Sequence, residues 1–273
     1  MRGLQPGRET GAAARRGCVT VKGRMTRTEL HFHLLPEVDD GPADLDDAVG
    51  LARLAVADGT GLVTVTPHVR DLMAHGILGE VPARVREVQD ALDAAGVPLE
   101  VRTGAELAHD DVAAFDARTL DAIAQGPRDA RWVLIEAPLF SARVDEFLAA
   151  TAWVREQGFG TLIGHPERCA PLMERPDAIA AERAAGARLQ VNASSLTGAH
   201  GEAERARGLA LVRAGQVDVI ASDAHRATRP PRLGAALAVL EAHGIRGGEA
   251  LVRDVPRALL EHGLGALPAA RAA

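Results

Sequence analysis

Residues 28–33 read TELHFH, a short β-rich run that ends in two histidines one residue apart. Alternate residues of a β-strand face the same side, so we expect the imidazoles of His31 and His33 to point the same way at a strand end. The stretch VDVIASDAH over 217–225 repeats this arrangement with Asp223 and His225. A fold that brings the two pairs together would place four metal-binding side chains in one site.

Seven apolar runs of this kind follow one another in the sequence, separated by alanine- and leucine-rich stretches with helical spacing. Alternation of strand and helix predicts parallel strands, and in a βα barrel every strand points its carboxyl end at the same face. We therefore predict an α/β fold, a distorted seven-stranded (β/α)7 barrel of the TIM type with the metal site at the carboxyl ends of the strands. The predicted strands cover residues 28–32, 61–66, 98–104, 131–136, 160–164, 188–192 and 217–222.

One domain accounts for most of the chain, because 273 residues, 47% of them hydrophobic, can bury a large core. We expect this domain to span residues 27–265, followed by a frayed tail over 266–273. Residues 1–26 are expected to be a disordered extension. Alternatively, the given start codon lies upstream of the true one, and Met25 is the initiator. Asp44 is the expected N-cap of the first helix. The predicted helices include 45–58, 82–95, 232–244 and 247–263.

The composition argues against several classes of partner. A net charge of −6 offers no broad positive surface to nucleic acid or to an anionic membrane. No apolar stretch approaches the roughly 18 residues of a spanning helix, so we expect no membrane insertion. The only two cysteines, Cys18 and Cys169, exclude a disulfide framework and fit a reducing cytoplasm.

Polar side chains stand at or just past the end of nearly every predicted strand, and this predicts a metal centre. Imidazoles and carboxylates crowded onto one face need positive charge between them, which metal ions supply. A single His-x-His pair is a weak signal, but two pairs at the ends of a closing barrel become neighbours. The further strand-end residues are His68, Glu106, Glu136, His165 and Asn192.

The number and type of these groups predict what the centre does. One zinc ion takes three or four protein ligands, whereas at least eight candidates converge here, so we expect two or three ions. Imidazole and carboxylate without thiolate suit Mn²⁺, Fe²⁺ or Zn²⁺. Clustered divalent ions lower the pKa of a bound water and clamp the oxygens of a phosphoester, so the predicted chemistry is hydrolysis.

A family resemblance rests on motifs in fixed order: HFHLLPEVDDG, TPH, GAE, IEAP, GHPER, VNASSLTG, and ASDAH with RPPRL. Together they resemble the PHP (polymerase and histidinol phosphatase) superfamily. Within it, the chain is most similar to the bacterial manganese-dependent protein-tyrosine phosphatases of the capsule and exopolysaccharide (CpsB/CapC-like) type, from about residue 28 to about residue 233. The resemblance implies the PHP barrel, phosphoric monoester hydrolysis and Mn²⁺ as the metal.

The resemblance further implies a trinuclear site with nine ligands. Asp40 is preferred to Asp39 because it stands nine residues after His31, as in the family pattern. The implied ligands are His31, His33, Glu106 and Asp223 for one ion, Glu136 and His165 with Glu106 bridging for a second, and Asp40, His68 and His225 for the third.

The resemblance also assigns the catalytic arginines and the substrate. Arg168 and Arg229 match positions at which the family binds phosphate, and a guanidinium offers paired donors to phosphate oxygens. A metal-bridging hydroxide would attack phosphorus without a phosphoenzyme intermediate. The implied substrate is phosphotyrosine on a protein, namely the tail of a bacterial tyrosine kinase that controls polysaccharide synthesis and export. A homo-oligomer is compatible with these expectations.

Three features depart from the family pattern, and none of them removes a ligand. Position 29 is Glu where the family usually has Asp, a change that would alter contacts to the first histidines. Ala137 stands where an aromatic is common, so packing beside the cleft would differ. The chain has no tyrosine and therefore cannot itself be phosphorylated on tyrosine.

Other functions stay open as alternatives. A phosphoesterase acting on a small phosphomonoester, histidinol phosphate or a nucleotide, would use the same ligands. A nuclease or proofreading module would need a basic groove, and a metal-free regulatory module would have lost ligands. Cys169 to Arg175 has the C-x5-R spacing of cysteine-based phosphatases, but CAPLMER lacks their glycine-rich phosphate loop, so we interpret the match as coincidence.

The remaining strand-end and loop residues receive structural interpretations. Asn192 is expected to hydrogen-bond loop backbone or a side chain that lies behind the metal ligands, rather than to contact a metal directly. Five histidines have no partner at ligand spacing and are interpreted as surface residues, two of them close to the cleft mouth (His75 and His109). The other three are His200, His243 and His262.

Overall fold

The structure is a computed structural model that describes residues 26–139 and 143–266. Within these residues, parallel pairing links the strands into two sheets. The smaller sheet has the order β1 (Arg27–Phe32), β2 (Thr60–Val65), β3 (Glu100–Arg102). The larger sheet has the order β4 (Glu106–Ala108), β5 (Trp132–Glu136), β6 (Gly160–Gly164), β7 (Arg188–Asn192), β8 (Val219–Ala221).

Two isolated parallel bridges join the sheets to each other. Phe32, at the end of β1, pairs with Ala224 just after β8, and the His33 N–H donates to the Ala224 carbonyl oxygen at 2.9 Å. On the other side, His68 just after β2 pairs with Glu106, the first residue of β4. Residues of both sheets therefore meet where the strands of the smaller sheet end.

The predicted number of seven strands is wrong, because an eighth strand, β4, forms just beyond the end of the third predicted strand. The prediction places one strand over 98–104, whereas the structure has β3 paired with β2 and then β4 paired with β5. Gly104 lies between them, and a Cβ there would come within 2.7 Å of Thr64 Cγ2 and 3.0 Å of Gln125 Cγ. The backbone passes too close to these side chains to carry one of its own. All seven predicted strands form within two residues of the expected bounds, and β4 is the strand that was not predicted.

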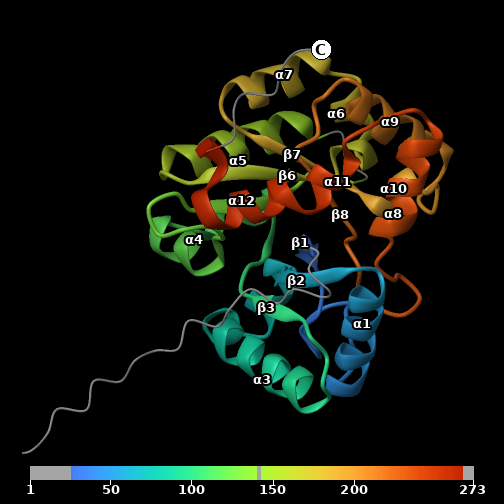
Figure 1. Cartoon of the computed structure of the whole chain (residues 1–273). Helices are drawn as coiled ribbons and strands as arrows, with labels where there is room; N and C mark the ends of the chain where they lie inside the picture. The colour runs from blue at the N-terminus through green and yellow to red at the C-terminus, as the bar shows by residue number, and fades with distance from the viewer. Residues whose placement is uncertain (1–25, 140–142, 267–273) are drawn as a thin grey trace, which may run out of the picture.

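Helices connect the strands, and Figure 1 shows α1 (Leu45–Ala57) and α3 (Val81–Ala94) beside the smaller sheet. Asp44 caps α1 as predicted, its carboxylate accepting the Asp47 N–H at 2.8 Å. The other connecting helices are α2 (Val69–Ala74), α4 (Ala117–Ile123), α5 (Val144–Glu156), α6 (Ala170–Met173), α7 (Pro176–Ala184), α8 (Ala193–Leu196), α9 (Glu202–Arg213) and α10 (Leu233–Ala242). Short 3-10 turns are η1 (Leu78–Glu80), η2 (His109–Ala114), η3 (Pro166–Arg168) and η4 (Leu264–Ala266).

The predicted helix over 247–263 is two helices, α11 (Gly248–Val252) and α12 (Asp254–His262). Pro256 has no N–H to donate to the Val252 carbonyl, so one continuous helix is unfavourable there. Among the described residues no helix has both the length and the apolar character needed to cross a membrane. The predicted extension over 1–26, apart from Thr26, and all but the first residue of the predicted tail lie outside the described residues.

The C-terminal helices cover the amino ends of the larger sheet. The indole N–H of Trp132, the first residue of β5, donates to the Leu259 carbonyl oxygen at 3.2 Å. Arg188, the first residue of β7, donates to the Leu264 carbonyl oxygen. The same region holds a buried apolar cluster that includes Leu30, Leu62, Leu134, Leu162, Val219 and Leu259. With the amino ends packed, the carboxyl ends of the strands are the face at which a site can open.

Candidate metal centre

Most of the nine predicted ligands stand in the last residues of a strand or in the loop that follows it; Glu106 opens β4 where the chain leaves β3. His165 and Asp223 have backbone φ angles of 35° and 52°, in the left-handed region that residues other than glycine rarely adopt. Such strained conformations cluster at functional sites, because the surrounding structure must hold them in place. The left-handed backbone conformation at His165 and Asp223 therefore marks this face as a functional site.

The register of β1 against β2 is irregular beside the site. Between Glu29 and Phe32, β1 advances three residues while its partner β2 advances two. Bulges interrupt side-chain alternation and re-aim side chains beside functional sites. Leu30 packs into the apolar cluster, whereas His31 next to it contacts the polar centre. The Nε2 atoms of His31 and His33 lie 3.3 Å apart.

The buried carboxylate of Glu106 lies between four imidazoles. Its Oε2 is 3.1 Å from His68 Nδ1, 3.2 Å from His31 Nε2 and 3.4 Å from His33 Nε2. Its Oε1 is 3.2 Å from His165 Nε2. A carboxylate with both oxygens engaged in this way has the geometry to bridge two cations.

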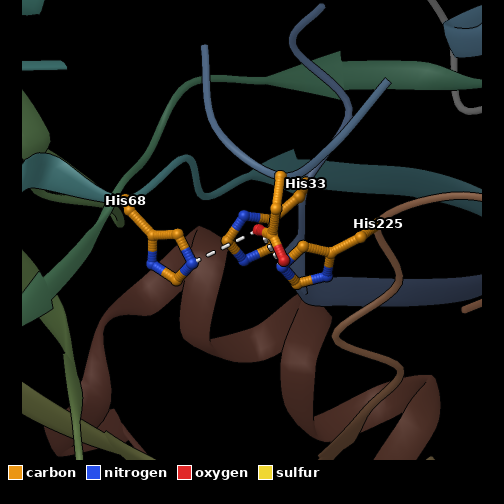
Figure 2. Close-up of side chains that lie close together, drawn as sticks. His33, His68 and His225 are labelled. Carbon is orange, nitrogen blue, oxygen red and sulfur yellow. Dashed lines mark ion pairs between the residues drawn. The ribbon is translucent and has the colours of Figure 1, made fainter. Parts of the chain in front are cut away.

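Three imidazoles form a second group around Asp40, and Figure 2 shows His33, His68 and His225 turned toward one another. Asp40 Oδ1 lies 3.1 Å from His225 Nε2 and 3.6 Å from His68 Nε2. The rings of His33 and His225 stack with their centroids 3.7 Å apart. These four residues have ligand atoms that all lie within 4.8 Å of one another.

Asp39 has a different position from its neighbour Asp40. One oxygen of Asp39 lies 2.7 Å from His33 Nδ1 and accepts the His68 N–H at 3.1 Å, and the other accepts the Gly41 N–H at 2.9 Å. Asp39 thus contacts the far side of the His33 ring. Asp40 is the carboxylate that faces the group of imidazoles.

Glu136 is the one predicted ligand outside the three tight groups of ligand atoms found among the described residues. Its Oε1 lies 3.8 Å from His165 Nε2. Burial, together with the negative charge of Glu106, raises the pKa of Glu136 to about 8. The other groups are His31 with Glu106 and His165, and His31 with His33 and Asp223.

The carboxylates and imidazoles of the centre favour positive charge in the space between them. Burial lowers the pKa of His33, but the charge and hydrogen bond of Asp39 outweigh it and raise the pKa to about 9. Burial likewise opposes ionisation of Glu106, yet the imidazoles around it hold its pKa well below the usual value. The Nδ1 atoms of His31 and His33 face the Gln190 and Asp39 oxygens, so in neutral rings the hydrogen is on Nδ1 and both facing Nε2 atoms carry lone pairs. A nitrogen and oxygen donor set at this spacing fits divalent cations.

Hydrogen bonds from β7 support the ligands from behind. His31 Nδ1 lies 3.0 Å from Gln190 Oε1, and the Gln190 amide donates to Asn192 Oδ1 at 2.7 Å. Asn192 Nδ2 in turn donates to Asp223 Oδ2 at 2.8 Å, so the Asn192 side chain contacts a predicted ligand. Glu29 accepts the Ser222 N–H at 2.7 Å through one oxygen. Partners of this kind fix the orientation of metal-binding side chains.

Both predicted arginines lie over the centre. Arg168 contacts Asp223 Oδ2 at 3.4 Å, and Arg229 contacts Asp40 Oδ2 at 3.0 Å and Asp223 Oδ2 at 3.5 Å. They line a cavity of about 370 Å³ together with seven of the predicted ligands and with Arg232 and His200. The cavity therefore has acidic and imidazole groups on one side and guanidinium groups near them, an arrangement that suits an anion held against cations.

The structure corrects the interpretation of two histidines as surface residues. His109 is half-buried, with its ring 6.3 Å from that of Phe147 in an edge-on contact. His200 is also half-buried and lines the cavity, so it is a residue of the site that the sequence analysis missed. Its place in the loop after β7, on the same face as the ligands, was the available signal. The exposed histidines are His75, His243 and His262.

Cys169 lies away from the cavity and is fully buried. Burial raises the pKa of its thiol, whereas a nucleophilic cysteine needs a lowered pKa and access to substrate. The interpretation of CAPLMER as a coincidental match agrees with this placement.

Comparison with known proteins gives this arrangement a family. The family described as "Capsular polysaccharide synthesis, CpsB/CapC" matches residues 27–261. The tyrosine-protein phosphatase YwqE of Bacillus subtilis is 32% identical over 224 residues, which cover 78% of this chain and 83% of YwqE.

Solved structures agree with the sequence comparison. A structure reported for YwqE from Bacillus subtilis and CpsB from Streptococcus pneumoniae, described as metal-dependent tyrosine phosphatases, matches with a TM-score of 0.72 and 27% identity. The match covers 86% of this chain and 94% of the other. An amidohydrolase from Mycoplasma synoviae, 12% identical with a TM-score of 0.52 over 86% of this chain and 88% of its own, shares the fold alone. The chain belongs to the CpsB/CapC family of capsular polysaccharide synthesis.

Proposed function

We propose that the protein is a metal-dependent phosphatase that removes phosphate from tyrosine on proteins. The observation that carries the proposal is the cavity in which Arg168 and Arg229 lie over the imidazoles and carboxylates gathered around Glu106. The activity named for YwqE, at 32% identity, supports the same reaction.

Two or three divalent ions would occupy the centre, with Mn²⁺ favoured and Fe²⁺ or Zn²⁺ as alternatives. The spacing of ligand atoms supports one set around Glu106 and another around Asp40. One ion would be held by His31, His33, Glu106 and Asp223. A second would be held by Glu106, Glu136 and His165, and a third by Asp40, His68 and His225. Such ions supply a water of lowered pKa and neutralise phosphate charge.

The protein side chains supply binding and charge stabilisation. Arg168 and Arg229 would exchange their present contacts with Asp223 and Asp40 for contacts with the phosphate oxygens. A guanidinium can donate two parallel hydrogen bonds to two oxygens of one phosphate dianion. Donors already in place stabilise charge that develops during transfer. A phenolate leaves readily, since its conjugate acid has a pKa of about 10, so no dedicated general acid is required.

The remaining proposals concern architecture and cell biology. The two sheets, joined by their bridges, form one distorted barrel in a single domain over 27–265. The family description supports a bacterial tyrosine kinase of polysaccharide export as the substrate protein. The small number of cysteines supports a cytoplasmic location.

Chelation tests the proposal directly. Dialysis against EDTA should abolish hydrolysis of a phosphotyrosyl peptide, and Mn²⁺ should restore it, because the cation centre supplies the attacking water. Glu106→Gln is the matched variant, which should stay inactive after Mn²⁺ is added. Full activity in chelator would contradict the proposal. Faster turnover of histidinol phosphate or nucleotides than of the peptide would favour the small phosphomonoester alternative.

A further inference from the structure

His200 is the residue of the cavity that the proposed mechanism leaves without a role. It lies in the loop between α8 and α9, half-buried, and its Nδ1 is 3.0 Å from the Ser195 hydroxyl oxygen. Within the described ranges its Nε2 has no hydrogen bond or ion pair. One ring nitrogen is therefore held by the protein, the other has no partner within the described ranges, and the residue lines the cavity.

The hydrogen bonds behind His200 determine which nitrogen carries the proton. Glu167 Oε1 accepts the Asn192 N–H at 3.0 Å and the Ser195 hydroxyl at 2.7 Å. A hydroxyl has a single proton, and Ser195 gives it to Glu167. The Ser195 oxygen can then only accept from His200, so Nδ1 carries the hydrogen and Nε2 keeps its lone pair.

The surroundings of His200 keep this ring uncharged. Burial lowers the pKa of His200, the nearby charge of Arg168 lowers it further, and the result is about 4. A neutral ring with a free Nε2 is a hydrogen-bond acceptor and not a donor.

A neutral imidazole acceptor differs from the charged groups that line much of the cavity. The carboxylates of Asp40 and Asp223 already face guanidinium groups, and Glu106 faces imidazoles. The guanidinium groups of the lining are donors suited to phosphate. A phosphate dianion has no hydrogen to give, so a lone pair on the wall gains nothing from it. In a bound substrate, the group that can donate to His200 is an N–H or O–H outside the phosphate.

We propose that His200 is a specificity-determining residue whose Nε2 accepts a hydrogen bond from a main-chain N–H of the peptide that carries the phosphotyrosine. The inference rests on the proposed function and deepens it, because it separates peptide substrates from simple aryl phosphates. Ser195 acts as a positioning residue that sets the direction of the ring.

Substitution of His200 tests the inference through substrate selectivity. In His200→Ala and His200→Phe, the ratio of kcat/KM for a phosphotyrosyl peptide to kcat/KM for phenyl phosphate should fall about three- to tenfold, the usual worth of one hydrogen bond. The loss should appear mainly in the KM for the peptide. His200→Gln, which retains an acceptor oxygen, should recover part of the ratio, and the exposed His243→Ala should leave it unchanged.

A series of peptides methylated at one main-chain nitrogen at a time identifies the donor. Methylation of the N–H that His200 accepts should weaken turnover by the wild-type protein and have little effect on His200→Ala. Imidazole ¹⁵N shifts should show the Nδ1–H form of His200, and Ser195→Ala should disturb it.

The outcomes separate this inference from the proposed function. If the Mn²⁺-loaded wild-type protein hydrolyses neither substrate, the proposed function fails. If it hydrolyses both, and the His200 variants keep the wild-type selectivity ratio or lose both activities equally, the inference about His200 is overturned. A ring with its proton on Nε2 would overturn it as well.

Discussion

Neighbouring carboxylates take different roles when one is buried and the other faces a cavity, as Asp39 and Asp40 show. The Asp39 side chain is 1% exposed and its oxygens are taken by His33 and two main-chain N–H groups, whereas the Asp40 side chain is 58% exposed. The charge of His33 outweighs burial and lowers the pKa of Asp39 to about 2. Asp39 thus orients an imidazole while Asp40 stays available to a cation.

The arginines over the centre give a prediction at the same scale. Arg168→Ala or Arg229→Ala should lower kcat for a phosphotyrosyl peptide on the order of 10²-fold, because each removes a donor aimed at the phosphate. Steady-state kinetics at saturating Mn²⁺ checks this. Arg175→Ala is the control, since Arg175 pairs with the exposed Asp145 and belongs to the C-x5-R match. A comparable loss in Arg175→Ala would revive the cysteine mechanism.

Most residues of the site could be predicted from the sequence because strand ends converge in parallel βα folds. His31, His33 and Asp223 were visible from their spacing alone. Asp40 could be distinguished from Asp39 only through the family resemblance. His200 was missed although its place in the loop after β7 was a signal, because its contact with Ser195 and the nearby charge of Arg168 arise only in the folded chain.

Among the elements, the passage from β3 to β4 shows how one glycine decides a strand boundary. The sequence predicts one strand over 98–104, which forms as β3, and gives no prediction of β4 after Gly104. The division follows from the approach of Thr64 and Gln125, which come from other segments of the chain. Contacts of this kind cannot be read from a local pattern. The break between α11 and α12, in contrast, had a visible signal in Pro256.

Substitution of Gly104 tests this account. Gly104→Val should lower the free energy of unfolding by about 1–3 kcal/mol, because its side chain must displace Thr64 and Gln125. Urea unfolding of the metal-free protein measures the change. Gly50→Ala in α1, where an added Cβ meets nothing within 4 Å, is the matched control and should be neutral or stabilising by up to about 1 kcal/mol. Equal stability of Gly104→Val and the wild type would show that the close approach is tolerated.

For the whole molecule, the centre draws its ligands from both sheets. His31, His33 and His68 belong to β1 and β2 or to residues just after them, whereas Glu106 and Glu136 belong to the larger sheet. The bridges between the sheets lie among these same residues. Cations in the centre would therefore tie the two sheets together.

Metal removal should consequently lower the thermal stability of the whole domain. A ligand at about 100 times its Kd adds about 2.7 kcal/mol, so excess Mn²⁺ should raise Tm by about 5 °C or more over the chelated protein. Differential scanning calorimetry with and without Mn²⁺ measures this. Glu106→Gln should show a much smaller shift. A wild-type Tm that is the same with and without Mn²⁺ would mean that no bound cation stabilises the contact between the two sheets.

The burial of Cys169 has a consequence for the conditions under which such an enzyme works. Thiol-dependent phosphatases stop when peroxide converts their nucleophile to a sulfenic acid. Here the described residues that line the cavity include no cysteine or methionine, and Cys169 is fully buried in the core. Turnover by this design is thus insensitive to that oxidant at its nucleophile and depends instead on the cell's supply of transition metal.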